Sequence, residues 1–213
     1  VYFADASFAG DLRDSKSTSG GILVLMGPNT FVPLAWIAKK QGAVSHSTSE
    51  AEIISLELGI RMEGIPALML WSLVIDVFHP EGSNKAEASG GKPQLEPRVP
   101  LTVHDILSLV DHVPPTVPLP SCRARLFVLE DNDAVLKMII KGRAPALRHV
   151  QRTHRINLDW LYERIRTDPS INLKFVPTKL RLADLLTKGQ FTAELWNSLC
   201  RLLQVGPPRP PIS

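Results

Sequence analysis

The stretch VYFADASFAGDLRDSKSTSGG, from Val1 to Gly21, predicts the start of a β-sheet and places an acidic residue inside it. Residues 1–7 alternate in character and include Val, Tyr and Phe, which is typical of a strand, and the polar stretch that follows predicts a turn before a second apolar run. Asp5 therefore lies within the expected strand, where a buried carboxylate needs a partner or a metal ion. On this stretch alone, a turn-capping carboxylate explains Asp5 as well as a metal ligand does.

The composition indicates a globular chain with a basic second half. The chain has 213 residues, of which 44% are hydrophobic and 21% charged, and its formal net charge is +3. Residues 1–120 carry 8 Lys and Arg against 13 Asp and Glu, whereas residues 121–213 carry 16 against 8, so the two parts have charges of −5 and +8. The length allows one domain with a substantial core, and we expect the basic half to face an anionic partner.

The sequence lacks the features of secreted and membrane-spanning chains. It has no signal-peptide core and no run of eighteen apolar residues. Cys122 and Cys200 have neither the number nor the spacing of a disulfide framework or a metal site, so ordinary thiols in a reducing compartment are expected. Because the sequence opens inside an expected strand without an initiator Met, we expect it to be part of a longer polypeptide.

A hairpin is predicted after the first strand. The apolar runs 21–26 and 30–38 flank Gly27-Pro28-Asn29, which is typical hairpin punctuation. Pro33 indicates that the last of these strands lies at a sheet edge or carries a bulge. Three antiparallel strands are therefore expected to open the fold.

Residues 45–64 predict a helix with two overlapping capping boxes, Ser47 with Glu50 and Ser49 with Glu52. The two glutamates point about 200° apart on a helix, so only one of them faces the sheet. If Ser47 is the cap, Glu50 is used there and Glu52 is free.

A second helix and an insert are expected next. Gly64 and Pro66 should interrupt the first helix, and the apolar residues 67–78 should form a core helix that is too short to span a membrane. Residues 80–122 hold 8 of the chain's 18 prolines, which predicts a partly disordered insert. Its segment LTVHDILSLVDHV fits a short amphipathic helix better than a metal site, although it contains His104, Asp105, Asp111 and His112.

A strand-and-helix unit with further acids follows the insert. Residues 125–131 (RLFVLED) predict a buried strand that ends in two acids, and Asn132 opens the next helix. Strand-end acids beside a helix N-terminus are typical of α/β active sites, although helix capping also explains Asp131 and Asn132. By strand alternation Glu130 and Asp131 face opposite sides, so at most one is expected to join Asp5.

A basic run without acids comes next and leads into a helix that extends through Trp160 to Arg166. Such a run is usually a solvated surface, but beside clustered carboxylates it is a candidate for phosphate contact. Its charged residues are Lys141, Arg143, Arg148, Arg152 and Arg155, accompanied by His149 and His154.

Three elements complete the prediction. Residues 172–178 form the last strand, residues 181–188 a short helix that contains Asp184, and residues 191–205 an amphipathic helix. The proline-rich tail from Pro207 is expected to be disordered.

The order of these elements and several motifs closely resemble a known family. The chain is similar to the ribonuclease H domain at the end of the Pol polyprotein of copia-type long-terminal-repeat retrotransposons. The matching pieces, spread over residues 2–191, are ADASFAGDLRDSKSTSGG, AWIAKKQGAVSHSTSEAEIISL, LEDNDAVLKMI, RTHRINLDW and VPTKLRLADLLTKGQF.

The resemblance implies an α/β fold with a mixed five-stranded sheet, three antiparallel strands followed by parallel additions, flanked by helices. The ribonuclease H-like domain would span residues 1–79 and 123–205, around an insert at 80–122 and before a tail at 206–213. The family's acidic quartet would fall on Asp5, Glu52, Asp131 and Asp184.

The implied activity is hydrolysis of the RNA strand of RNA·DNA hybrids during reverse transcription. Two Mg²⁺ ions, or Mn²⁺ in their place, would be the cofactors, with Asp5 bridging them, Glu52 and Asp131 on one ion and Asp184 on the other. The hybrid would be recognised through phosphates and 2′-hydroxyls. The expected contacts are Ser17, Thr18, Asn132, Lys141, Arg143, Arg148, Arg152, His154 and Arg155.

The expected partner besides the hybrid is the reverse transcriptase domain of the same polyprotein, with no membrane involved. The expected location is intracellular, in a cytoplasmic virus-like particle or in the nucleus. The family pattern RTKHIDI is replaced here by RTHRINL, residues 152–158, which leaves the substrate path and the role of His154 open.

Two alternatives stay open. A decayed or recruited copy would bind hybrids without cutting them. An integrase-type core would carry its acids in another order, with a helical Glu third; the helical acid comes second here, which favours ribonuclease H.

Overall fold

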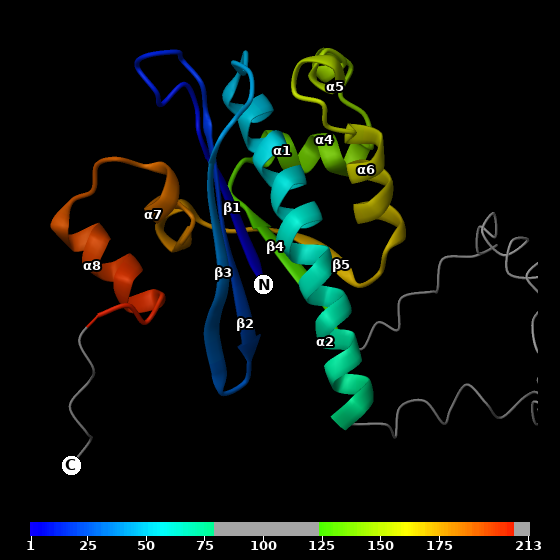
Figure 1. Ribbon diagram of the computed structural model, residues 1–213, viewed down its shortest axis with the longest axis vertical. Coiled ribbons are helices and arrows are strands. Elements are labelled where there is room, and N and C mark those ends of the chain that lie inside the picture. Colours follow the sequence, from blue (N-terminus) through cyan, green and yellow to red (C-terminus); the bar gives the residue numbers. More distant parts are fainter. Residues whose placement is uncertain (79–123, 207–213) are drawn as a thin grey trace, which may run out of the picture.

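A mixed five-stranded sheet organises the computed structural model, which describes residues 1–78 and 124–206 (Figure 1). The strand order is β3-β2-β1-β4-β5; β1, β2 and β3 are antiparallel, and β4 and β5 are added in parallel to β1. This arrangement confirms the expected fold class. The strands are β1 (Tyr2–Ser7), β2 (Thr18–Gly27), β3 (Thr30–Lys40), β4 (Leu126–Glu130) and β5 (Ile171–Phe175).

Helices cover both faces of the sheet. Figure 1 shows α1, α4 and α6 on one side and α7 and α8 on the other. The helices of the first half are α1 (Thr48–Gly59), the π-helical turn η1 (Ile60–Gly64) and α2 (Ile65–Phe78). Those of the second half are α4 (Asp133–Lys141), η3 (Pro145–Leu147), α5 (Val150–Thr153), α6 (Leu158–Thr167), η4 (Thr178–Leu180), α7 (Asp184–Thr187) and α8 (Ala193–Leu202).

Alternation along β1 gives each face its own core. Tyr2 belongs to the buried cluster beneath α1, α4 and α6, and Phe3 belongs to the one beneath α7 and α8. The Tyr2 ring lies so close to Gly21 and Gly59 that a Cβ at either position would overlap it. The two glycines therefore allow α1 to pack closely on the sheet.

The β2–β3 hairpin forms where the sequence predicts it. β2 ends at Gly27 and β3 begins at Thr30, so two residues make the connection. Pro33 lies on the edge strand β3 and pairs with Val24 of β2. The register of the two strands shifts between Leu23 and Val24. Pro33 thus lies on an edge strand beside a bulge, where a missing N–H is tolerated.

The predicted helix break at Gly64 and Pro66 is wrong. The chain stays helical from α1 through η1 into α2, because the wider π-helical turn absorbs the irregularity before Pro66. Gly64 is buried there against β4, where an added Cβ would approach Leu126 Cδ2 to 2.7 Å. The small residue serves close packing and does not end the helix.

The prediction of a core helix at residues 67–78 is also wrong. In the described part of the chain, no residue of α2 is fully buried. Leu73 is 63% exposed and Phe78 is 73% exposed. By length and composition, the continuous helix Thr48–Phe78 could cross a membrane, so the expectation of a helix too short to span one is wrong as well. Its α1 half, however, packs on the sheet with Ile53 and Leu56 fully buried, as a core helix does.

Several boundaries in the second half differ from the predictions. β5 ends at Phe175 instead of residue 178, and the helix expected at 181–188 is the four-residue α7, preceded by the short turn η4. α8 ends at Leu202 instead of residue 205. The expected insert and nearly all of the expected tail lie outside the described residues.

Candidate metal centre and basic surface

All four predicted acids meet at one place, two from each half of the chain. Asp5 comes from β1, Glu52 from α1, Asp131 from the end of β4 and Asp184 from the start of α7. Each of them forms an ion pair with the same side chain, Arg181. The structure therefore brings the sequence-predicted acids together.

Local hydrogen bonds fix Asp5. Ser55 Oγ on α1 donates to the Asp5 carbonyl oxygen at 2.6 Å and joins the helix to β1. Thr187 Oγ1 on α7 donates to Asp5 Oδ2. Elements from both faces of the sheet thus hold Asp5 within β1, one through its carbonyl oxygen and one through its carboxylate.

The capping box explains why Glu52 is free to join Asp5. Ser47 Oγ accepts from the Glu50 N–H at 3.1 Å, and Glu50 Oε2 accepts from the His46 N–H at 3.0 Å. Glu50 is thus used at the cap, as predicted. Glu52, two residues on, is 3% exposed and reaches Arg181.

Strand alternation gave the wrong answer for the two acids of β4. Glu130 is the last strand residue, and Asp131 follows the strand, so alternation no longer sets its direction. One oxygen from each of Glu52, Glu130 and Asp131 lies within 4.8 Å of the others. Glu130 therefore joins the cluster alongside Asp131 as a fully buried fifth acid, and the prediction that at most one of the two joins Asp5 is wrong.

Arg181 lies at the centre of these acids and was not predicted. Its Nη2 lies 2.6 Å from Asp5 Oδ1 and 2.8 Å from Glu52 Oε1, and its Nη1 lies 2.6 Å from Asp131 Oδ1. The longer contacts, both 3.8 Å, are to Glu130 Oε1 and Asp184 Oδ1. The spacing of three residues to Asp184 was the available signal, because side chains at i and i+3 of a helical turn are neighbours.

Burial dominates the electrostatics of this cluster. It raises the pKa of Asp5 to about 6 and that of Glu52 to about 7, and Arg181 lowers both in part. Burial and then the charge of Glu52 raise the pKa of Glu130 to about 9. The Arg181 pKa is lowered by burial, but Glu52 and Asp5 raise it more, so the guanidinium stays charged.

The cluster has the donor set of a site for a hard cation. Three of its buried carboxylate oxygens have no hydrogen-bond partner within residues 1–78 and 124–206: Glu52 Oε2, Glu130 Oε2 and Asp184 Oδ1. Oxygen atoms of this kind are ligands for divalent metal ions. Glu52, Glu130 and Asp131 could therefore hold a metal ion.

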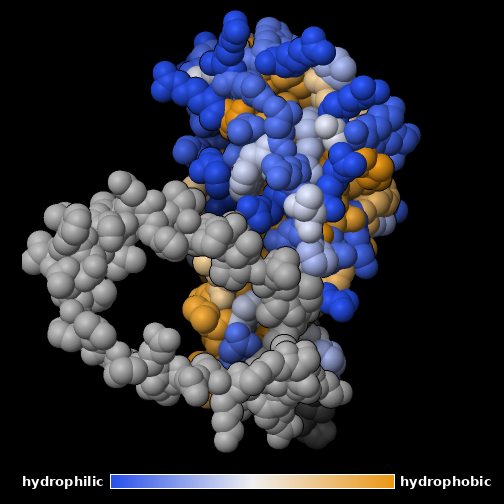
Figure 2. All heavy atoms as spheres, turned by 90° about the vertical axis from the view of Figure 1, so that its right-hand side faces the viewer, coloured by the Kyte–Doolittle hydropathy of each residue, from blue (hydrophilic) through white to orange (hydrophobic). Residues whose placement is uncertain are grey.

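The predicted basic residues form an exposed surface beyond α4. Three of them, Arg143, Arg148 and Arg152, line one groove together with Tyr162. The face shown in Figure 2 is hydrophilic over its upper part, the level at which α5 and α6 lie in Figure 1. All five cationic residues of the run are exposed: Lys141, Arg143, Arg148, Arg152 and Arg155.

Three predicted nucleic-acid contacts, Ser17, Asn132 and His154, make structural contacts within the chain. Ser17 is buried, and its Oγ accepts from the Ala9 N–H. Asn132 Oδ1 accepts from two backbone N–H groups and caps α4. His154 has a side chain that is 2% exposed and packs against Glu50, so it faces neither solvent nor the acid cluster. Thr18, at the start of β2, is half-buried.

Glu50 joins the basic surface to α1. Its Oε1 lies 3.2 Å from His149 Nε2 and 3.4 Å from His154 Nε2. The His46 ring packs edge-on against His149. One buried carboxylate thus completes the helix cap and holds the segment that carries the arginines.

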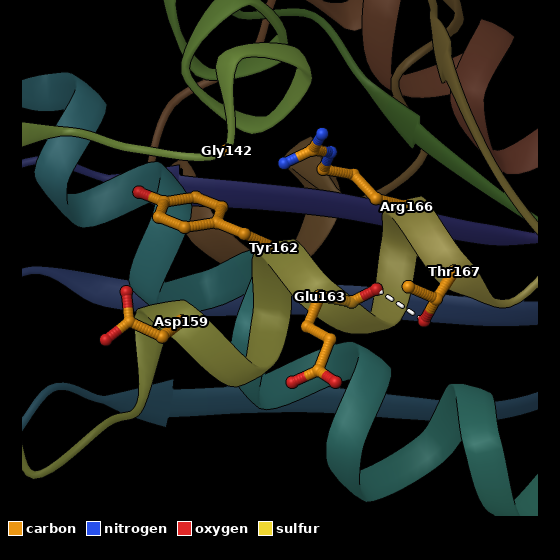
Figure 3. Close-up of a pocket in the computed structure, with 6 residues that line it drawn as sticks. All are labelled: Gly142, Asp159, Tyr162, Glu163, Arg166 and Thr167. Atoms are coloured by element: carbon orange, nitrogen blue, oxygen red, sulfur yellow. Dashed lines mark hydrogen bonds between the residues drawn. The ribbon is translucent and has the colours of Figure 1, made fainter.

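A second pocket lies between α6 and the end of α4, and Figure 3 shows its lining. Gly142, at φ +66°, ends α4, and Arg166 packs so closely over it that a Cβ would collide with the guanidinium. The Tyr162 hydroxyl has no hydrogen-bond partner in the described part of the chain, and burial raises its pKa to about 12. None of the clustered acids lines this pocket.

The four residues weighed for a metal site within the insert, His104, Asp105, Asp111 and His112, lie outside the described residues. Comparison of the chain with protein-family models, with curated proteins and with solved structures finds no match.

Proposed function

We propose that this chain is a metal-dependent nuclease that hydrolyses the RNA strand of RNA·DNA hybrids, as the ribonuclease H domain of a copia-type Pol polyprotein. The observation that carries the proposal is the meeting of Asp5, Glu52, Asp131 and Asp184, from four separate elements, in one buried cluster on a mixed five-stranded sheet. Burying several carboxylates together lowers the stability of the fold. A purely structural role therefore does not explain why acids so far apart in the sequence converge.

The proposed cofactors are two Mg²⁺ ions, with Mn²⁺ as a substitute. Asp5 would bridge them, Glu52 and Asp131 would hold one, and Asp184 the other, with Glu130 as a further candidate ligand. When bound, such ions supply an activated hydroxide and stabilise the leaving oxygen of the cleaved phosphodiester.

The chain's own residues would orient the substrate. The exposed arginines around α5 would neutralise phosphates on one strand, which positions the hybrid but does not specify its sequence. Short polar groups and backbone amides near the start of β2 would contact 2′-hydroxyls, which distinguish RNA from DNA. Thr18 stays a candidate here, whereas Ser17 and Asn132 are committed to structural hydrogen bonds.

The proposal extends to partners and location. The reverse transcriptase domain of the same polyprotein would be the covalent partner, and no membrane would be involved. The site of action would be intracellular, in a cytoplasmic virus-like particle or in the nucleus.

The test is a cleavage assay on a labelled RNA·DNA hybrid with Mg²⁺, beside RNA·RNA and DNA·DNA duplexes of the same sequence. We expect cleavage of the RNA strand of the hybrid alone. Cleavage of the DNA duplex at an equal rate would contradict the proposal and favour an integrase-type nuclease.

A second candidate function is hybrid binding without cleavage. The position of Arg181 favours it, because a guanidinium 2.6 to 2.8 Å from three of the acids already neutralises part of the cluster. Hybrid binding in a gel-shift assay, without RNA cleavage in Mg²⁺ or Mn²⁺, would support this second function over the first.

A further inference from the structure

Arg181 fills the space between the carboxylates of the candidate metal centre. Its side chain is 6% exposed, and its charged nitrogens contact acids from β1, α1 and the end of β4 within 2.8 Å. Its Nε also donates to the Ala4 carbonyl oxygen at 3.2 Å. A hydrogen bond to the backbone, in addition to the ion pairs, therefore holds the guanidinium in place.

One guanidinium does not satisfy the cluster. Asp5, Glu52, Glu130, Asp131 and Asp184 bring five carboxyl groups together against two cationic side chains, Arg181 and Lys188, and Lys188 Nζ lies 2.5 Å from Asp184 Oδ2. Arg181 has only five N–H donors, set in a fixed plane. Buried oxygens of Glu52, Glu130 and Asp184 accordingly stay without hydrogen bonds in the described part of the chain.

The same acids that could hold a metal ion are those that Arg181 contacts. Glu52, Glu130 and Asp131 form the group whose oxygens lie within 4.8 Å of one another, and Arg181 pairs with each of them. A divalent ion at the centre of this group would be a second cation beside the guanidinium. Like charges repel strongly where solvent is excluded. A metal ion and the Arg181 guanidinium that shared these oxygens would therefore destabilise each other.

We propose that Arg181 is a built-in cation that competes with divalent metal ions for the acid cluster, so that metal binding requires the guanidinium to leave Glu52 and Asp131. Without metal, Arg181 stabilises the folded chain by neutralising buried acids. The proposal rests on the proposed function only in taking the cluster to bind divalent ions.

Metal affinity of the complete chain tests the competition directly. Isothermal titration with Ca²⁺, which has the same preference for oxygen ligands, and with Mg²⁺ should give a Kd at least tenfold lower for Arg181→Gln than for the parent. Arg181→Lys, which keeps the charge but loses the planar fork, should fall between them. Arg201→Gln on the exposed face of α8 is the matched control and should leave the Kd unchanged.

A melt in EDTA supplies a second readout. Arg181→Gln should melt at a lower temperature than the parent without metal and regain the difference in excess Ca²⁺. If Arg181→Gln does not fold in EDTA, the proposal predicts that it refolds in Ca²⁺ and that Arg181→Lys binds Ca²⁺ with a lower Kd than the parent. Equal Kd values for the parent and both Arg181 variants, or no metal binding by any of them, would overturn the proposal.

The hybrid cleavage assay separates this outcome from the proposed function. Tighter metal binding by Arg181→Gln without RNA cleavage by either protein would support competition between Arg181 and metal ions and contradict the proposed nuclease activity. Cleavage by the parent with unchanged metal affinity in the variants would support the nuclease activity and contradict the competition.

Discussion

Replacing Glu130 by Gln should remove a pH-dependent loss of stability from the metal-free protein. Glu130 is fully buried, and its Oε2 has no hydrogen-bond partner in the described residues. Its pKa is raised from 4.5 to about 9, first by burial and then by the charge of Glu52. The native carboxyl therefore keeps a proton at pH values where the unfolded chain has released it.

The sign and size of the effect follow from proton linkage. The native state binds more protons, so the stability contributed by Glu130 is complete below its ordinary pKa of 4.5 and is lost as the pH rises towards 9. The loss is about 1.4 kcal/mol per pH unit for one proton, or roughly 2 kcal/mol between pH 7 and 8.5.

Above pH 7, the change in unfolding free energy comes mainly from Glu130 and not from the neighbouring titratable groups. Asp5 and Glu52, with pKa values raised to about 6 and about 7, lose their contributions at lower pH and with the same sign. His154 has a pKa lowered from 6.5 by burial, so its contribution is lost as the pH falls below that value.

Urea unfolding in EDTA, followed by tryptophan fluorescence at several pH values from 7 to 9, measures this slope. The parent and the control Glu163→Gln, an exposed acid on α6, should lose stability as the pH rises, and Glu130→Gln should lose much less, with only the remainder of the Glu52 contribution just above pH 7. A flat profile for the parent, or an unchanged slope in Glu130→Gln, would refute the reasoning.

Three further predictions concern the basic surface and the element ends. Replacing Arg148 and Arg152 with Ala should reduce the slope of log affinity against log salt for hybrid binding by about two units, and an unchanged slope would identify an ordinary solvated surface. Gly142→Ala should lower the unfolding free energy by about 1 kcal/mol or more, measured by urea titration, because L residues strain at φ +66° and the Cβ would displace Arg166. Glu50→Gln should cost about 1 to 3 kcal/mol in the same titration and increase hydrogen exchange in α5, because it weakens the buried contact between Glu50 Oε1 and His149 Nε2.

The first half of the fold follows closely from the sequence because its signals are local. Apolar alternation, the two-residue hairpin after Gly27 and the capping box at Ser47 each depend on a few neighbouring residues. They correctly identified the strands, the start of α1 and the glutamate that is free to face Asp5. The resemblance to a family with four spaced acids selected the same four positions that the structure brings together.

The misses depend on three-dimensional context. The apolar composition of α2 favours burial, but only its first turns, with Ala67 and Leu68, pack against the core, and its lower end projects past the sheet in Figure 1. Strand alternation fails for Asp131 because the strand ends one residue earlier. Arg181 reads as one more cation in a basic half, and its role is visible only once four elements converge around it.

Paired cleavage rates of Asp131→Asn and Asp133→Asn on a labelled RNA·DNA hybrid in Mg²⁺ test most directly whether the acid cluster is a catalytic metal centre. The two aspartates are two residues apart, but Asp131 contacts Arg181 within the cluster whereas Asp133 is exposed on α4. We predict that Asp131→Asn lowers the rate of RNA cleavage by about a hundredfold or more, because one ligand oxygen of the metal centre is lost, while Asp133→Asn keeps the parent rate. Equal rates for the two variants, or a parent that binds the hybrid and leaves its RNA intact, would contradict this.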